Sequence, residues 1–278
     1  MPSPFGQIAA VLLAIVTMLV GGSARAEDFR IFTVVYDLAA VQKPGEKPPV
    51  AARAVTLFHA GKVYDYVDAA DEVIVLEPTQ RRFRVLAPKR KLVATADFDE
   101  IKQRLNIARE ETRKYAATLT GAEPESAKTA ALLAFQLDPR FEESFSPTDG
   151  KLTLLGGPIS YSARTADPQR PGIANAYLDY ADWACQLNYL LHPGPVLPDP
   201  RLALNHSLRA KGRIPESVEL QSDTIRSLHL RAEHTVSFNL NERDENLIFQ
   251  WESQLKSEAT RQIPLREYQK TVLAVRDK

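Results

Sequence analysis

A stretch of strictly alternating polarity lies near the end of the chain, from Leu228 to Leu240. Its even positions carry apolar residues and His234, whereas its odd positions are polar or charged. Successive side chains of a β-strand point to opposite faces, so the pattern predicts a long strand with one wet face. A second alternation after a turn predicts the other half of a long hairpin, with its apolar side at Leu247, Phe249, Trp251 and Leu255. Such strands exceed the usual length of about five to six residues and favour a strongly curved sheet.

Short segments rich in β-branched and aromatic residues fill the part of the chain after residue 28. Turn signals separate them, for example Ala60-Gly61 and Pro78-Thr79-Gln80. Because strands joined by short turns run antiparallel, the segments predict a meander. They cover residues 29–38, 54–59, 62–67, 72–77, 82–87 and 91–95.

The hydrophobic period then changes to that of a helix. Apolar residues recur at steps of three and four from Phe98 to Leu119, which predicts an amphipathic helix. Further helices are predicted at 124–137, 173–191 and 201–211, and strand character returns at 141–146 and 152–165.

Together these elements predict an α+β fold. We expect a curved, mostly antiparallel, half-barrel-like sheet of about eight to ten strands, with amphipathic helices packed on one face. Residues 27–278 are expected to form a single domain that carries a helical, proline-rich insertion at about 173–211.

The N-terminal segment has the features of a secretory signal peptide. Residues 8–20 are apolar and uncharged, but shorter than the roughly 20 residues of a membrane-spanning helix. Small residues at Ala24 and Ala26 predict cleavage after Ala26. The mature protein is then expected to be periplasmic or secreted, without a stable transmembrane segment. No Lys or Arg precedes the apolar run, so an uncleaved N-terminal membrane anchor is the alternative.

Composition narrows the class of function. The chain has 35 Lys and Arg and 35 Asp and Glu. Because Arg25 is removed with the signal, the net charge of the mature chain is 34 − 35 = −1. This balance argues against a nucleic-acid-binding protein, which usually carries a basic excess. Cys185 is the single cysteine, so no intramolecular disulfide can form. We expect Cys185 to be a buried, unreactive side chain.

Catalytic and metal-binding motifs are not evident in the sequence. It contains neither a Gly-x-Ser-x-Gly elbow nor a phosphate loop, and its histidines lack the spacing of metal ligands. We therefore predict no catalytic residue, no metal site and no cofactor. The histidines are His59, His192, His206, His229 and His234.

Ligand-binding candidates lie on the apolar face of the predicted hairpin: His234, Phe238 and Trp251. A histidine on such a face can line a pocket and titrate there. The alternative is a hydrogen-bonded core histidine with a structural role.

A basic segment stands out in a chain of balanced charge. Its side chains predict contact with an anionic partner, such as lipid headgroups, a cell-wall polymer or an acidic protein surface. Alternatively, the charges protect an edge strand from aggregation. The segment consists of Arg81, Arg82, Arg84, Lys89, Arg90 and Lys91.

Two segments of the meander resemble the periplasmic lipoprotein-carrier (LolA/LolB-like) superfamily. They are Thr56 to Tyr66, with its Gly61-Lys62-x-Tyr64 strand, and Ile74 to Pro78, a strand that ends in a proline turn. The resemblance covers residues 29–95 and, more loosely, 228–255. It implies an unclosed antiparallel half-barrel whose helices cover an apolar mouth that binds acyl chains. The helical segment 173–211 departs from that family, and no functional residue is carried over.

Three functions are therefore compatible with the sequence. The first is an exported, non-enzymatic envelope protein that binds or carries an apolar or lipidic ligand, such as a lipoprotein acyl chain, in a groove between sheet and helices. The second is an envelope interaction protein that uses the basic segment 81–91 to bind an anionic envelope component. The third is a hydrolase whose site does not show in the sequence. An apolar cavity on the concave face favours the first, whereas a face filled by the helix 98–120 argues against it.

Overall fold

The computed structural model describes residues 28–41, 45–119, 123–225 and 228–276. The predicted signal peptide and its cleavage site after Ala26 lie outside these residues. In the parts that are described, no helix combines the length and apolar character needed to cross a membrane.

One sheet of twelve strands organises the described chain, in the order β12-β6-β5-β4-β3-β2-β1-β11-β10-β9-β8-β7. All neighbouring strands are antiparallel except β12 and β6, which are parallel. The strands are β1 (Phe29–Asp37), β2 (Val50–His59), β3 (Lys62–Val67), β4 (Glu72–Glu77), β5 (Arg82–Ala87), β6 (Leu92–Asp97), β7 (Glu142–Ser146), β8 (Lys151–Leu155), β9 (Ile159–Ala166), β10 (Ile214–Ser222), β11 (His229–Ser237) and β12 (Arg261–Pro264).

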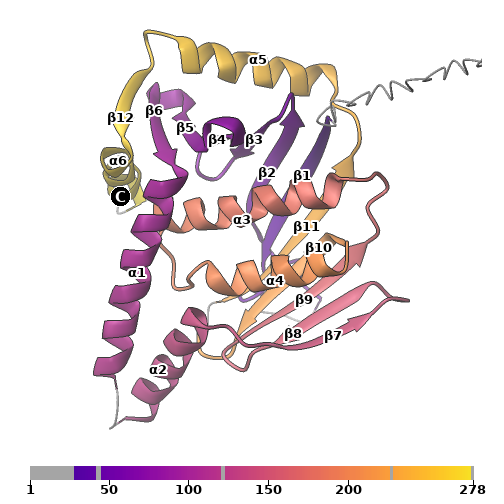
Figure 1. Ribbon diagram of the computed structural model, residues 1–278, viewed down its shortest axis with the longest axis vertical. Helices are drawn as coiled ribbons and strands as arrows, with labels where there is room; N and C mark the ends of the chain where they lie inside the picture. Colours follow the sequence, from indigo (N-terminus) through magenta and orange to yellow (C-terminus); the bar gives the residue numbers. More distant parts are fainter. Residues whose placement is uncertain (1–27, 42–44, 120–122, 226–227, 277–278) are drawn as a thin grey trace, which may run out of the picture.

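The sheet curves around one helix (Figure 1). Phe83 of β5 and Leu152 of β8 come from distant parts of the strand order, yet both belong to the core that surrounds α3. A shared core requires the sheet to bend so that this face is concave. The helices are α1 (Phe98–Thr118), α2 (Pro124–Leu137), α3 (Ile173–Leu191), α4 (Asp199–Ala210), α5 (Glu242–Lys256) and α6 (Leu265–Arg276).

Helix α3 crosses the concave face and supplies much of the core. Its Leu178, Leu187 and Leu191 are at most 1% exposed. Helix α1 packs beside α3 and then runs away from the sheet together with α2 (Figure 1). The predicted fold class is thus confirmed. On the concave face, α3 is joined by the first turns of the helix predicted at 98–120, which bury Phe98, Ile101 and Leu105 in the same core. The segment 173–211 contains α3 and α4.

The opposite, convex face carries a second core. Strand β4 contributes Ile74 and Leu76 to the concave core, and Val73 and Val75 to the convex one, as expected from the two-residue period of a strand. Helix α5 covers the convex face over β2–β6 (Figure 1).

The strand predicted from Leu247 to Leu255 is therefore wrong, because these residues belong to α5. The apolar residues that α5 buries are Ile248, Trp251 and Leu255, at steps of three and four. Strand β11 forms no hairpin with them; its neighbours are β1 and β10.

Asn241 explains where α5 begins. Its side chain accepts a hydrogen bond from the Asp244 amide, and the Asp244 carboxylate accepts one from the Asn241 amide, both at 3.0 Å. This reciprocal capping box satisfies two backbone donors that the first turn leaves unpaired. Arg30 of β1 also donates to the Asp244 carboxylate at 3.1 Å, which ties the start of α5 to the sheet.

Replacement of Asn241 with alanine is expected to lower the free energy of unfolding by about 1 kcal/mol, because the N-cap acceptor is lost. Urea-induced unfolding followed by circular dichroism measures this change. Ser253→Ala is the matched control, since its exposed hydroxyl only bonds back to the Phe249 carbonyl. Equal midpoints for Asn241→Ala and the wild type would show that the cap contributes nothing.

Several elements were not predicted. Strand β10 was missed because an irregularity between Pro215 and Ser217 shifts its register and breaks the alternation. The stretch 152–165 has the predicted strand character and forms β8 and β9, which Gly156-Gly157-Pro158 connects. The segments β12 and α6 at the C-terminal end were also missed.

Candidate functional site

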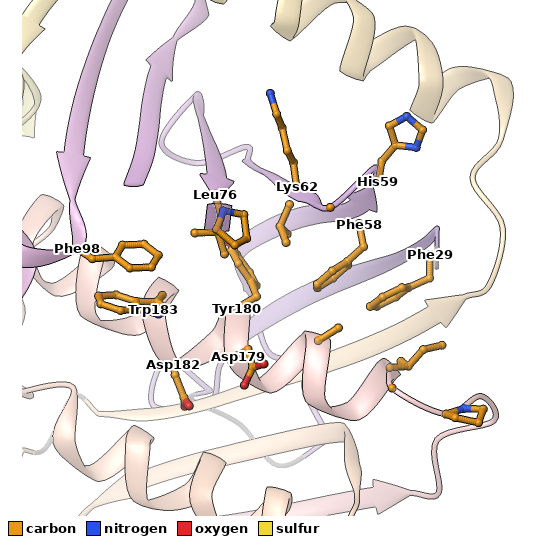
Figure 2. A pocket seen from close by; sticks show the side chains of 17 residues that line it. Phe29, Phe58, His59, Lys62, Leu76, Phe98, Asp179, Tyr180, Asp182 and Trp183 are labelled. Carbon is orange, nitrogen blue, oxygen red and sulfur yellow. The ribbon is translucent and has the colours of Figure 1, made fainter. Parts of the chain in front are cut away.

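A groove of about 920 Å³ opens between α3 and the ends of strands β1–β4. The start of α1 closes one side through Phe98, and the loop before α3 closes another through Pro171 and Gly172. Figure 2 shows the side chains that converge on it. This volume falls within the range of about 300–1,000 Å³ that is usual for small-molecule sites.

Two aromatic stacks form the walls of the groove. The rings of Phe29 and Phe58 stack with their centroids 3.9 Å apart, because the β1–β2 register places these residues opposite each other. On the other side, Phe98 stacks on Trp183 of α3 at 3.7 Å. Tyr180 meets the edge of Phe58 at 6.0 Å and joins the sheet wall to α3. These rings present broad apolar surfaces to the groove.

The charged residues that line the groove have partners of their own. Lys62 binds Glu252 at 2.7 Å and Glu77 at 3.0 Å, and these carboxylates raise its pKa although burial acts in the opposite direction. Asp182 accepts a hydrogen bond from Arg209 of α4 at 2.8 Å. In Figure 2, Lys62 points to one rim, whereas the carboxylate of Asp182 points away on the far side of α3. The groove therefore offers an apolar interior and charged rims that are already neutralised.

Tyr180 also separates the groove from a polar layer beneath α3. Its hydroxyl donates to the Asp65 carboxylate at 2.6 Å, and Thr56 donates to the same carboxylate at 2.8 Å. Burial raises the pKa of Asp65, although both hydrogen bonds oppose the shift. The phenol ring thus faces the groove while its hydroxyl is engaged elsewhere.

The predicted binding residues do not share one site. His234 and Phe238 line a smaller cavity of about 250 Å³ beyond the start of α3. Trp251 lies on the convex face, where it stacks with Tyr64 and Tyr66 at 6.3 Å and 6.2 Å. The prediction that Trp251 lies on the apolar side of a hairpin is wrong. Trp251 belongs to α5, which lies on the opposite side of the sheet from α3.

His234 is a poor general base. Its Nδ1 and the Thr33 hydroxyl oxygen form a hydrogen bond at 2.9 Å, which gives this side chain a structural partner. Burial, assisted by the charge of Arg201, lowers the pKa of His234 to about 3. A general base works best with a pKa near the operating pH, so this geometry does not favour the hydrolase hypothesis.

The basic segment is divided between two regions. Arg81 precedes β5 and pairs with Asp99, whereas the Lys89–Lys91 end follows β5 and approaches β12 and α6. A six-residue strand separates them by roughly 20 Å. Strand β5 lies between β4 and β6, so the alternative of a protected edge strand is wrong.

The side chains within the basic segment have separate partners. Arg82 donates to Glu77 at 2.7 Å, and Arg84 donates to the Leu255 carbonyl of α5 at 3.0 Å. Lys89 pairs with Asp71 at 3.3 Å. Contact between this segment and an anionic partner stays a prediction.

The remaining histidines are dispersed. His59 pairs with Asp28, His192 at the end of α3 pairs with Glu72 of β4, and His229 pairs with Glu219 of β10. His206 lies on α4. The described residues contain no group of three His, Cys, Asp or Glu side chains arranged to hold a metal ion.

Cys185 lies on α3 and is half-buried, so it is less enclosed than expected. Its thiol donates to the Asp182 carbonyl at 3.3 Å, and burial raises its pKa to about 12. Because the thiolate is the reactive form, this cysteine is a weak nucleophile.

Comparisons with known protein families and with curated proteins gave no match to this chain. The groove was not predicted as a set of residues, although its strands and α3 were. Its one detectable signal is the large aromatic residue at the first position of β1 and near the end of β2, since Phe29 and Phe58 become neighbours once these strands pair.

Proposed function

We propose that this protein is an exported, non-enzymatic envelope protein that binds an apolar ligand, such as an acyl chain, in the groove beside α3. The observation that carries the proposal is an apolar groove of about 920 Å³ walled by two aromatic stacks. Ligand sites of this kind are concave, mostly apolar and largely formed before binding.

The chemistry of the lining supports an apolar ligand over a charged one. The charges nearest the groove are engaged in ion pairs, so a charged ligand would gain little there. An apolar ligand gains about 2.5 kcal/mol for each 100 Å² of surface removed from water. The flat rings of Phe29, Phe58 and Trp183 suit a chain or ring that slides between them.

Export is supported by the sequence alone. Residues 8–20 have the length and apolar character of a signal-peptide core, followed by small residues before Glu27. N-terminal sequencing of the protein isolated from its host tests this part. A start at Glu27 agrees with a periplasmic or secreted protein, whereas a start at Met1 or Pro2 replaces it with an anchored one.

Replacement of Ala176 with tryptophan tests the groove. Ala176 is exposed and lines the groove, so a large ring there fills the space without entering the core. We expect the affinity for N-phenylnaphthylamine, a neutral fluorescent dye, to fall at least about tenfold, which corresponds to 1.4 kcal/mol. Dye fluorescence titration of the purified full chain measures the affinity.

Asn175→Trp is the matched control for this experiment. Asn175 neighbours Ala176 on α3 and is exposed, but it does not line the groove. We expect its affinity for the dye to stay within twofold of the wild type, because an equal ring is added outside the site. Dye binding that is equally weak in both variants, or undetectable in the wild type, overturns the proposed function.

A further inference from the structure

Lys62 is the only lysine or arginine among the described residues that line the groove. It begins β3, directly after the turn at Ala60-Gly61, and its side chain reaches the rim (Figure 2). A lone cation at the mouth of an apolar groove would ordinarily attract the carboxylate or phosphate of an amphiphilic lipid. How far Lys62 can act in this way depends on the charges that already surround it.

Two carboxylates from different elements hold Lys62. Its Nζ lies 2.7 Å from Oε1 of Glu252, on α5, and 3.0 Å from Oε1 of Glu77, at the end of β4. The side chain of Glu77 is 6% exposed and that of Glu252 is 20% exposed, so neither pair is a loose surface contact. Burial acts to lower the pKa of Lys62, but the hydrogen bonds and charges of Glu252 and Glu77 raise it overall. The lysine therefore stays charged at neutral pH, with two negative charges in contact with it.

Further hydrogen bonds fix these two carboxylates in place. Arg82 donates to Glu77 at 2.7 Å, and the Tyr64 hydroxyl donates to Glu252 at 2.8 Å. Each carboxylate thus has a partner in the sheet besides the lysine. Neither is free to turn away and make room for a second anion at this rim.

The other charged residues that line the groove are also paired. Asp179 and Asp182 both bind Arg209 of α4, at 3.1 Å and 2.8 Å, and His59 pairs with Asp28 at 3.0 Å. In Figure 2, the carboxylates of Asp179 and Asp182 lie well below the aromatic rings of the groove. Among the described lining residues, every charged side chain therefore has a partner of opposite charge, and a charged ligand would have to displace one.

We propose that the groove takes an uncharged acyl lipid, such as a monoacylglycerol, and that Glu77 and Glu252 exclude anionic lipids by occupying Lys62. This specificity rests on the proposed function, since it requires an apolar ligand in the groove. An anionic head at this rim would lie against two fixed carboxylates, and repulsion between like charges lowers its affinity. A lysine has three N–H donors, so its two carboxylate partners leave one for a neutral ester or hydroxyl oxygen.

Displacement of N-phenylnaphthylamine from the purified full chain tests this specificity. The competitors are 1-monodecanoylglycerol, decanoate and decylammonium, which carry chains of equal length and differ in charge. Each is used at neutral pH and below the concentration at which it aggregates. We expect the neutral lipid to displace the dye at a concentration at least about tenfold lower than either ion, because each ion must compete with an existing ion pair.

Glu252→Gln tests whether the discrimination acts through Lys62, because any apolar site disfavours an ion to some extent. Glutamine has the size of glutamate and can still accept from Lys62 and Tyr64, but it removes one negative charge. We expect the affinity for decanoate to rise at least about fivefold, the effect of one partly buried charge. The affinity for 1-monodecanoylglycerol should stay within twofold of the wild type.

Glu245→Gln is the matched control. Glu245 is exposed and lies on the same helix, two turns or about 10 Å before Glu252. Its replacement removes the same charge at a distance where salt screens the effect, so both affinities should stay within twofold. In the double variant Lys62→Gln, Glu252→Gln, we expect the added affinity for decanoate to disappear, because the cation that would bind it is removed.

The outcomes separate this specificity from the proposed function. Wild-type protein that binds no dye overturns both. Dye that decanoate or decylammonium displaces as readily as 1-monodecanoylglycerol does overturns the specificity alone and leaves an apolar site. An unchanged affinity for decanoate in Glu252→Gln, or an equal rise in the double variant, overturns the role of the two carboxylates. Circular dichroism at the temperature of the titration shows that each variant is folded.

Discussion

Replacement of Trp251 with alanine is expected to lower the free energy of unfolding by about 3–5 kcal/mol, the usual loss for a buried tryptophan. Trp251 is 4% exposed and lies between α5 and the convex face, where its ring stacks with Tyr64 and Tyr66. Its removal leaves a cavity that the flat sheet surface cannot collapse to fill. Urea-induced unfolding followed by circular dichroism measures the loss.

Phe249→Ala is the control for this prediction. Phe249 lies on the same helix but is 71% exposed, so we expect a change within about 0.5 kcal/mol. A comparable loss in both variants would contradict the assignment of Trp251 to a buried core. Dye binding should persist in Trp251→Ala under conditions where it remains folded, because the groove lies on the opposite face.

The same segment shows why sequence patterns can mislead. Leu247, Phe249 and Trp251 are spaced by two, which is typical of a strand, and this spacing outweighed the helical one. The helical register was also present, since Ile248, Trp251 and Leu255 follow steps of three and four. Asn241 with Asp244 three residues later formed a capping signal at the start of α5. An exposed apolar residue, Phe249, completed the false alternation.

Local periodicity predicted the rest of the fold well where neighbours in sequence are neighbours in space. The meander β2–β6 joins consecutive strands by short turns, so its pattern and its pairing coincide. Strand β1, in contrast, pairs with β11 across most of the chain, and β12 pairs with β6 after a long interval. No local pattern encodes such partners, because they depend on how the whole sheet curves.

The candidate site was less predictable for the same reason. The groove needs Phe58 from β2, Phe98 from α1 and Trp183 from α3, which only the folded sheet brings together. His234 was identified because a histidine interrupts an apolar face, which is a local signal. Its partners Thr33, Tyr177 and Arg201 come from three other elements and carry no signal of their own.

His234 also makes the stability of the protein sensitive to acid. Its pKa of about 3 in the folded protein lies below the ordinary value of 6.5, because burial and Arg201 both disfavour the charged ring. In the unfolded chain the ring takes up a proton as the pH falls below 6.5, whereas the folded protein excludes it. The stabilisation is therefore fully present above pH 6.5 and is lost progressively towards pH 3.

The size of this effect follows from the shift. Each pH unit below 6.5 lowers the free energy of unfolding by about 1.4 kcal/mol. The loss is about 3 kcal/mol between pH 6.5 and 4.5, and it approaches roughly 5 kcal/mol at pH 3. Asp65 in the neighbouring polar layer acts in the opposite direction. Burial raises its pKa, so its contribution is lost as the pH rises and is regained in acid. A comparison of two variants at each pH isolates the histidine.

We expect His234→Asn to abolish most of this acid sensitivity. Asparagine can keep the hydrogen bond to Thr33, because its amide lies near the position of Nδ1, while it has no proton to take up. The free energy of unfolding, measured in urea from pH 7 to 4.5, should therefore fall by about 3 kcal/mol less in the variant than in the wild type. His229→Asn, a half-exposed position on the same strand, is the control. Parallel curves for wild type and His234→Asn would mean that the imidazole is not held neutral in the interior.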